Sequence, residues 1–452
     1  MTFAASGPGS PPAWQEPRGV PPPGEHVDPM KALTPRRPVG SRMVRILRTP
    51  MARWIAWIVV AIIFGSFVPR TYVLTTRPEG NDLGVYLESN RALVRGENPY
   101  AYSIAGAPQN HGPYPLTIDA LILPFTGIPL WLAETIWFGL SLAAFLGALA
   151  VLDQSWQRAT ADAGVTPEIP FAVRVAMVTL VLFVPLQSHF GYGQLDLIIL
   201  LTCCLFVRAL LDHRRGGAAF WLGSGIALKL TPAVFLVDLA ARRKVRLLLL
   251  TALWILVGAV LVPSLVSVQT LAFYRGAWLE GLRRHLESPV EIDWRTRFSL
   301  AGMLVRLWPP LLRVPGLHYW VATLVLAPLA ALGRPAARAA RAQLLLFAAY
   351  LTAIPLLSPI SEMHHLTMLL GALWVWLLAA GAPPRMLAFD GAAAALFVTL
   401  HWLGNAWSRT RPALGHYAAT RGSPFDSGAI LVLYLVLLVR AWLGCRASED
   451  AR

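Results

Sequence analysis

The chain has 452 residues, of which 56% are hydrophobic and only 14% charged, and its net charge is +15. Soluble domains carry about 25% charged residues, so this composition excludes an ordinary soluble protein and indicates an integral membrane protein. The arginines cluster between apolar runs, as in cytoplasmic loops, so the charge reflects membrane topology rather than nucleic-acid binding. Cys203, Cys204 and Cys445 lack the spacing of a disulfide framework or a zinc site.

The N-terminal segment, residues 1–42, is rich in proline, glycine and serine. Such a composition cannot bury a core, so we expect a disordered cytoplasmic tail. The segment has no charged start followed by an apolar stretch and a cleavage site, so we expect no signal peptide. A run of arginines precedes the first span, which ends near Pro69, and should hold the N-terminus inside.

The first polar loop, residues 70–113, should then lie outside. It contains NDLGVYLESNRALVRGENPY, which predicts a short amphipathic helix with Asn81 as its N-cap and Asp82 in its first turn. One side of this helix should rest on the membrane as an interfacial helix. That side carries Leu83, Leu87 and Val94.

The segment 114–129 is short, bounded by prolines and carries Asp119, which predicts a second helix that is interfacial or partly inserted in the membrane. Spans over residues 130–152 and 171–187 follow. The stretch HFGYGQLD then forms an outer turn, and LIILLTCCLFVRALL returns to the basic loop DHRRGG.

The segment AAFWLGSGIALKLTPAVFLVDLA lies between two basic loops, DHRRGG and ARRKVR. A single span would place these loops on opposite faces, against the positive-inside rule. Two half-length helices broken at KLTP place both loops inside, and Pro232 supplies the break. This hairpin makes Lys229 an intramembrane charge at its tip.

The rest of the chain continues the alternation of apolar and polar segments. A span over 247–263 leads to a long polar outer region, 264–316, and five more apolar segments follow. We therefore expect an all-α polytopic membrane protein with about twelve membrane segments and both termini inside. The membrane domain should cover residues 43–446, and residues 447–452 should form a cytoplasmic tail.

Polar residues that could form a site fall at the outer ends of the predicted segments. Charges at such positions are functional candidates, since they are costly in a membrane. The candidates are Asp82, Tyr86, Tyr114, Gln194, Asp196, Lys229, Arg297, Glu362, His364 and His365.

Several candidates also have a purely structural interpretation. Asp82 is either a general base or a favourable acid in a first helical turn. Lys229 either binds a phosphate or extends to the membrane interface. Gln194 and Asp196 either bind sugar hydroxyls or cap the next helix after a glycine turn.

The stretch SEMHH raises a similar choice. Adjacent helical residues face about 100° apart, so only one of His364 and His365 should face a site, whereas Glu362 and His365 share a face. They either bind an acceptor or phosphate, or begin a helix at the interface, and we expect no metal site. Arg297 contacts a phosphate or belongs to a solvated loop. Tyr114 should lie at the interface beside a donor groove.

Five stretches, taken in order, resemble glycosyltransferase family 87 over about residues 50–445. This family comprises polyprenyl-phosphate-mannose-dependent mannosyltransferases of the GT-C class. The five stretches are DLGVYLESNRALVRGENPY, YPLTIDALILPF, GYGQLDLIILL, GSGIALKLTPAVFLVDLAARRKVR and LLSPISEMHHLTMLL.

The resemblance implies a GT-C fold and transfer of a hexose, foremost mannose, from a polyprenyl phosphate with inversion. The acceptor would be a cell-envelope glycolipid or glycan on the outer face, and the acid of the first outer loop, Asp82, would act as base. Partners would be this donor, this acceptor and membrane lipids. No nucleotide-binding motif is present, and we expect no cofactor.

A transporter or flippase for a lipid or small anion is the alternative from a different class. Such a protein would also explain the broken hairpin and the membrane-embedded Lys229. The predicted location of nearly all polar clusters on one side argues against it, because alternating access needs polar groups along a whole path.

Overall fold

The computed structural model describes residues 45–75, 81–100, 102–104, 107–109, 115–161, 169–280, 298–358, 361–379, 386–409 and 424–450. The chain divides after Arg45, and the helices described below belong to the compact unit Ile46–Arg452. The predicted disordered tail, residues 1–42, lies outside the described residues.

In the first half of the unit, the regular structure of the described residues is helical apart from one β-hairpin, in which Tyr102 pairs with Gln109. Its elements are α2 (Pro50–Thr75), α3 (Asp82–Val94), β1 (Tyr102–Ile104), β2 (Ala107–Gln109), α4 (Thr117–Leu121), η3 (Leu123–Phe125), α5 (Leu130–Ala159), α6 (Phe171–Val181), α7 (Phe183–Tyr192), α8 (Asp196–Leu211), α9 (Arg215–Leu228), η5 (Thr231–Ala233) and α10 (Val234–Ala241).

The second half is helical throughout its described residues. Its elements are α11 (Val245–Leu256), η6 (Val257–Leu261), α12 (Val262–Val266), α13 (Thr270–Phe273), η7 (Tyr274–Trp278), α15 (Leu300–Leu307), η9 (Pro309–Arg313), α16 (Leu317–Ala336), α17 (Ala340–Leu357), η10 (Met363–Met368), α18 (Leu369–Ala379), α19 (Leu387–Arg409) and α20 (Pro424–Asp450).

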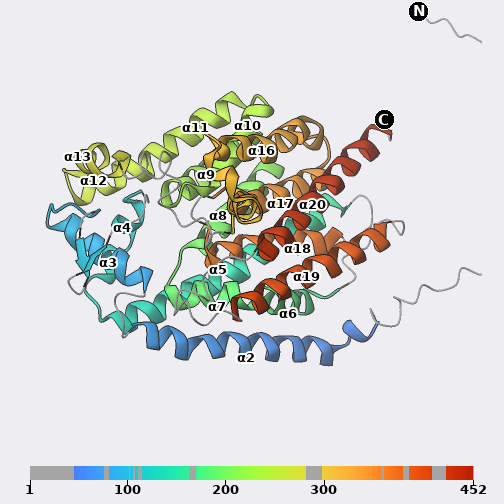
Figure 1. Cartoon of the computed structure of the whole chain (residues 1–452), viewed down its shortest axis with the longest axis horizontal. Helices are drawn as coiled ribbons and strands as arrows, with labels where there is room; N and C mark the ends of the chain where they lie inside the picture. The colour runs from blue at the N-terminus through green and yellow to red at the C-terminus, as the bar shows by residue number, and fades with distance from the viewer. Residues whose placement is uncertain are drawn as a thin grey trace, which may run out of the picture. The chain divides into compact units, whose positions relative to one another are not determined.

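Six of the described helical segments are long and apolar enough to cross a membrane, which confirms a polytopic helical membrane protein. They are α2, α5, α11 with its continuation through α12, α16, α17 and α20. The pair α6 and α7, bent by 78°, would make a seventh. Most of α17 is buried between α16, α18 and α20, whereas α11 presents most of its apolar surface outward, as a helix facing lipid does (Figure 1).

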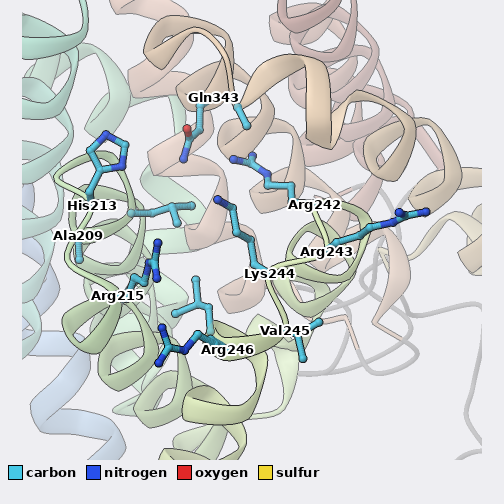
Figure 2. A pocket seen from close by; sticks show the side chains of 13 residues that line it. Ala209, His213, Arg215, Arg242, Arg243, Lys244, Val245, Arg246 and Gln343 are labelled. Carbon is cyan, nitrogen blue, oxygen red and sulfur yellow. The ribbon is translucent and has the colours of Figure 1, made fainter.

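The segment between the two basic loops is broken where the sequence predicts. Helix α9 ends at Leu228, Lys229 has an extended backbone (φ −155°, ψ 133°), and Pro232 lies in the first turn of η5. The turns that follow α8 and α10 line one cavity, so both basic loops lie at the same end of the helices (Figure 2). This arrangement confirms the predicted hairpin.

The first polar loop packs on the membrane helices. Leu83 and Leu87 of α3 are buried at 0% and 3% exposure, so the expectation that they rest on the membrane is wrong; only Val94 is exposed. This face of α3 packs against protein instead, and burial there removes apolar surface from water as contact with lipid would. The hydroxyl of Thr117 in α4 donates to the carbonyl of Gly258 at 2.9 Å. Helices α3, α4, α12 and α13 thus gather at one end (Figure 1).

Candidate active site

The N-terminus of α3 holds Asp82 at a fixed place. The side-chain oxygen of Asn81 accepts hydrogen bonds from the backbone N–H groups of Leu83 (2.8 Å) and Gly84 (3.4 Å), which confirms the predicted N-cap. The Asn81 amide also donates to Glu134 of α5. Asp82 is half-buried in the first turn and interacts electrostatically with Glu134.

The turn between α7 and α8 packs directly on this N-terminus. Gly193 has φ +65°, and a Cβ on it would lie 2.9 Å from the Leu83 Cβ and 3.1 Å from the Asn81 Oδ1. Glycine is required here both for the left-handed backbone and for the close approach. The turn therefore connects the N-terminus of α3 with the start of α8.

The start of α8 contacts Lys229. The Lys229 Nζ donates to the Asp196 Oδ1 at 2.9 Å, and the two side chains are only 4% and 1% exposed. A buried lysine requires such a partner, since burial of an isolated charge is very costly. The sequence suggested both residues, but not that they form a pair.

The capping interpretation of Gln194 and Asp196 is wrong. Helix α8 has Leu195 at its N-cap position and no side-chain capping hydrogen bond. Asp196 is engaged with Lys229 instead. Gln194 is 1% exposed, and its Oε1 has no hydrogen-bond partner among the described residues. A buried amide of this kind is available to a ligand.

The η10 turn brings Glu362, His364 and His365 to the same place. The Glu362 N–H donates to the His365 Nδ1 at 2.8 Å, and the Glu362 side chain accepts from the His365 backbone, so these two residues share a face as expected. The two imidazole rings lie 4.2 Å apart, and both reach within 4.8 Å of Asp196. The expectation that only one histidine faces the site is therefore wrong, because both rings converge from this tight turn.

Asp196, His364 and His365 lie close enough to share a cation, but their bonding does not favour one. The Nδ1 of His365 already accepts a hydrogen bond, so in the neutral ring its Nε2 carries the proton. The Lys229 ammonium already neutralises Asp196. Donor groups on Lys229 and His365 suit an anion such as a phosphate better than a metal ion.

Two acidic or basic residues of this region escaped the sequence analysis. His189 in α7 is fully buried, neither ring nitrogen has a hydrogen-bond partner in the described part of the chain, and it interacts electrostatically with Lys229. Glu134 is a carboxylate within an apolar span. That placement in LWLAETIW is the signal that could have identified it.

Of the three remaining candidates, the structure describes only Tyr86. Tyr86 lies one turn beyond Asp82 on α3 and is 2% exposed. Tyr114 and Arg297 lie outside the described residues. The residue after Arg297 is anchored near the site, because the Phe298 N–H donates to the Ser361 carbonyl at 3.1 Å.

Comparison with known proteins agrees with this picture. The model of glycosyltransferase family 87 matches residues 113–359, which is more than half of the chain. The chain is 27% identical over 369 residues to a polyprenol-phosphate-mannose-dependent α-(1-2)-phosphatidylinositol mannoside mannosyltransferase of Mycolicibacterium smegmatis, covering 75% of this chain and 74% of that protein. A protein of the same description from Mycobacterium tuberculosis is 27% identical over 359 residues, covering 76% of this chain and 77% of its own.

A third relative matches a shorter part of the chain. It is a polyprenol-phosphate-mannose-dependent α-(1-2)-phosphatidylinositol pentamannoside mannosyltransferase of Mycobacterium tuberculosis, 26% identical over 193 residues and covering 42% of each chain.

Proposed function

The chain belongs to glycosyltransferase family 87, and from that premise we propose that it transfers mannose from a polyprenyl-phosphate donor to a glycolipid acceptor, with Asp82 as general base. The relatives are named for phosphatidylinositol mannosides, and an acceptor of this class is the one we propose here. Because the chain belongs to a glycosyltransferase family, we propose a transferase rather than a transporter or flippase.

The proposed reaction is a single displacement. Asp82 takes the proton of an acceptor hydroxyl, whose oxygen forms a bond to the anomeric carbon of mannose. The bond from that carbon to the phosphate oxygen breaks, and polyprenyl phosphate leaves with the electron pair. Attack opposite the leaving group inverts the anomeric configuration, which requires base and phosphate on opposite sides of the sugar.

The leaving phosphate would be bound by the ammonium of Lys229 and the Nε2–H of His365. Fixed donors at the place where charge develops stabilise a transition state more than they stabilise the neutral starting bond. In this proposal Tyr86, Gln194, Glu362 and His364 complete the substrate-binding wall. Tyr114 and Arg297, which lie outside the described residues, are proposed to contribute as well.

The observation that carries the proposal is the Gly193–Asp196 turn. One end of it lies against the N-terminus of α3, which carries Asp82, and the other end pairs with Lys229. This short turn connects the helix that carries the proposed base with the cation proposed to bind phosphate. The two groups can therefore act on opposite sides of one sugar, as inversion requires.

The proposal extends to the arrangement in the membrane. The six long spans, the bent pair α6 and α7 counted as one, and the shorter helices α8, α9, α10, α18 and α19 would make the twelve segments of a GT-C fold. The membrane domain would cover residues 43–446, both termini would be cytoplasmic, and the Asp82 end of the helices would face outward.

The test is transfer from radiolabelled polyprenyl-phosphate mannose to phosphatidylinositol mannosides in membranes that carry the wild type or Asp82→Asn. We expect the substitution to reduce the transfer rate by about 10²- to 10⁴-fold, because the amide cannot accept the proton. The anomeric configurations of donor and product report inversion.

Glu88→Gln is the matched control, because Glu88 is a half-exposed acid of the same helix that pairs with Arg91. It should transfer at the wild-type rate. Full activity of a normally expressed Asp82→Asn protein would refute the assignment of the base.

A further inference from the structure

A cationic cavity lies at the other end of α8 from the candidate active site. It has a volume of about 610 Å³ and lies between the turn after α8 and the turn after α10 (Figure 2). The 16 residues of α8 place it about 24 Å from Asp196. Five cationic side chains line it: Arg215, Arg242, Arg243, Lys244 and Arg246.

Most of this charge is uncompensated. Arg242 pairs with Asp238 at 2.9 Å. Arg215, Arg243, Lys244 and Arg246 form no ion pair within the described part of the chain. The positive-inside rule accounts for basic loops, but not for the convergence of two of them on one cavity. Like charges gathered in this way repel each other, and an anion between them removes the repulsion.

A buried amide points to a ligand independently of the charges. Gln343 of α17 is 7% exposed and lines the cavity. Its side chain is directed toward the same space as Lys244 and Arg242 (Figure 2). No hydrogen bond to its side chain exists among the described residues. Because the amide lines the cavity, a molecule bound there can supply the hydrogen-bond partner that the described residues do not.

Two helices also begin at this cavity. Neither α9 nor α11 has a side-chain cap or an acid in its first turn. A Cβ on Gly223 of α9 would lie 2.5 Å from the Trp254 Cβ of α11, and one on Gly258 would lie 2.7 Å from the Ala227 Cβ. From the first contact to the second, the residue numbers rise along both helical segments. The two helices are therefore parallel, and their positive N-terminal ends lie together.

We propose that this cavity binds the phosphate group of an anionic lipid headgroup. Exposed apolar side chains lead away from it along α11, where acyl chains would lie: Val245, Leu249 and Leu253, at 60%, 66% and 52% exposure. Basic pockets between membrane helices bind anionic lipids in this manner. With the orientation given under the proposed function, this lipid would belong to the inner leaflet; the binding itself does not depend on that orientation.

The test is native mass spectrometry of the full-length protein in detergent with phosphatidylglycerol or phosphatidylcholine. The wild type should retain phosphatidylglycerol in preference. Arg243→Gln/Lys244→Gln/Arg246→Gln should weaken that binding at least about tenfold, because each cation near an anionic headgroup contributes. Gln343→Leu should weaken it several-fold without lowering the melting temperature, since an unpartnered amide is replaced by an apolar group of similar size.

Arg45→Gln/Arg48→Gln/Arg53→Gln removes as many charges before and within the first turn of α2, from residues that do not line the cavity, and should bind as the wild type does. Asp82→Asn should also bind normally, so failure of the proposed function and of this inference are distinguishable. Equal retention of both lipids by the wild type, or unchanged binding by the triple cavity variant, overturns the proposal. Displacement of the lipid by inorganic phosphate at similar concentration overturns the lipid assignment in favour of a soluble phosphate.

Discussion

At the scale of single residues, the candidate active site depends on the buried pair of Lys229 and Asp196. An ion pair taken out of water gains little net stability, but removal of one partner leaves an unpaired buried charge at a cost of about 3–5 kcal/mol. The pair therefore fixes Lys229 in one position. A phosphate that reaches it finds an ammonium already oriented.

This arrangement predicts a difference between single and double substitutions. Lys229→Met should lower the melting temperature strongly and abolish transfer, because Asp196 is left alone in an apolar site. Lys229→Met/Asp196→Leu should recover most of the melting temperature but none of the activity. Scanning fluorimetry and the mannose-transfer assay measure the two properties separately.

Glu97→Gln serves as the control, because its pair with Arg95 is more than half exposed and such pairs contribute little. It should change neither property. Transfer at the wild-type rate by the stable double variant would show that Lys229 has only a structural role.

The sequence identifies single residues of this site better than it identifies pairs. Lys229 is recognisable because it stands in an apolar segment next to a proline break. Its partner Asp196 lies 33 residues earlier, and no spacing rule connects residues on two helices that pack only in the tertiary structure. His189 was missed for the same reason, since what distinguishes it from an ordinary interfacial histidine is its full burial with no hydrogen bond to either ring nitrogen among the described residues.

At the scale of elements, the short turn between α7 and α8 aligns the two halves of the candidate site. Its left-handed Gly193 packs on the first turn of α3, and Asp196 begins the next helix. Any displacement of the turn moves α3 and Lys229 relative to each other. A displacement of about 1 Å can cost 10²-fold in rate when two groups must meet one substrate.

Gly193→Ala should therefore reduce transfer more than it reduces stability. The left-handed backbone costs roughly 1 kcal/mol for alanine, and the new methyl group would press on Leu83. We expect a fall of a few degrees in melting temperature and a roughly 10- to 100-fold lower transfer rate. The polyprenyl-phosphate KM and kcat, measured with melting curves, report both effects.

Gly139→Ala is the matched control, because Gly139 lies in helix α5 with open space around it. It should leave activity intact and should not lower stability, since alanine favours helix. Equal losses of activity in the two variants would argue against an aligning role of the turn.

The local signals at this scale were reliable. The Asn81 N-cap, the start of α3 and the break at Lys229 follow from capping and proline chemistry, which act within a few residues. The orientation of α3 did not follow, because an apolar face can pack on lipid or on protein and its sequence is the same in both cases. The sequence therefore misassigned the environment of Leu83 and Leu87.

At the scale of the whole molecule, the helices separate two sites of different character. The candidate active site pairs acids, histidines and one lysine at the start of α8, and the cationic cavity gathers basic side chains at its end. The polytopic helical architecture and the position of both basic loops at one end were predictable from hydropathy and charge, whereas six or seven of the twelve predicted segments are long and apolar enough to span a membrane. The convergence of the two basic turns on one cavity was not predictable, because it depends on how α9 packs against α11.

Labelling with a membrane-impermeant maleimide tests this arrangement. Cysteines at the exposed positions His213 and Arg243 should react from the same side of the membrane, and a cysteine at Glu97 should react from the opposite side. The native cysteines are buried and should stay unlabelled, so the wild type is the blank. Labelling of positions 213 and 243 from opposite sides would contradict the hairpin.

The short length of α9 affects the competition between water and the acceptor hydroxyl for the sugar. Its 14 residues extend about 21 Å, which is less than the hydrocarbon thickness of about 30 Å, so Lys229 stays within the depth of the membrane. In the proposed function, a phosphate bound to Lys229 would lie beside side chains that bulk water barely reaches. Water is the most abundant hydroxyl in any cell, and a sugar phosphate exposed to it can be hydrolysed. If the proposed function holds, this placement would shield the bond between sugar and phosphate from water and would favour an acceptor that carries its own lipid anchor, so that the donor reacts with the acceptor rather than with water.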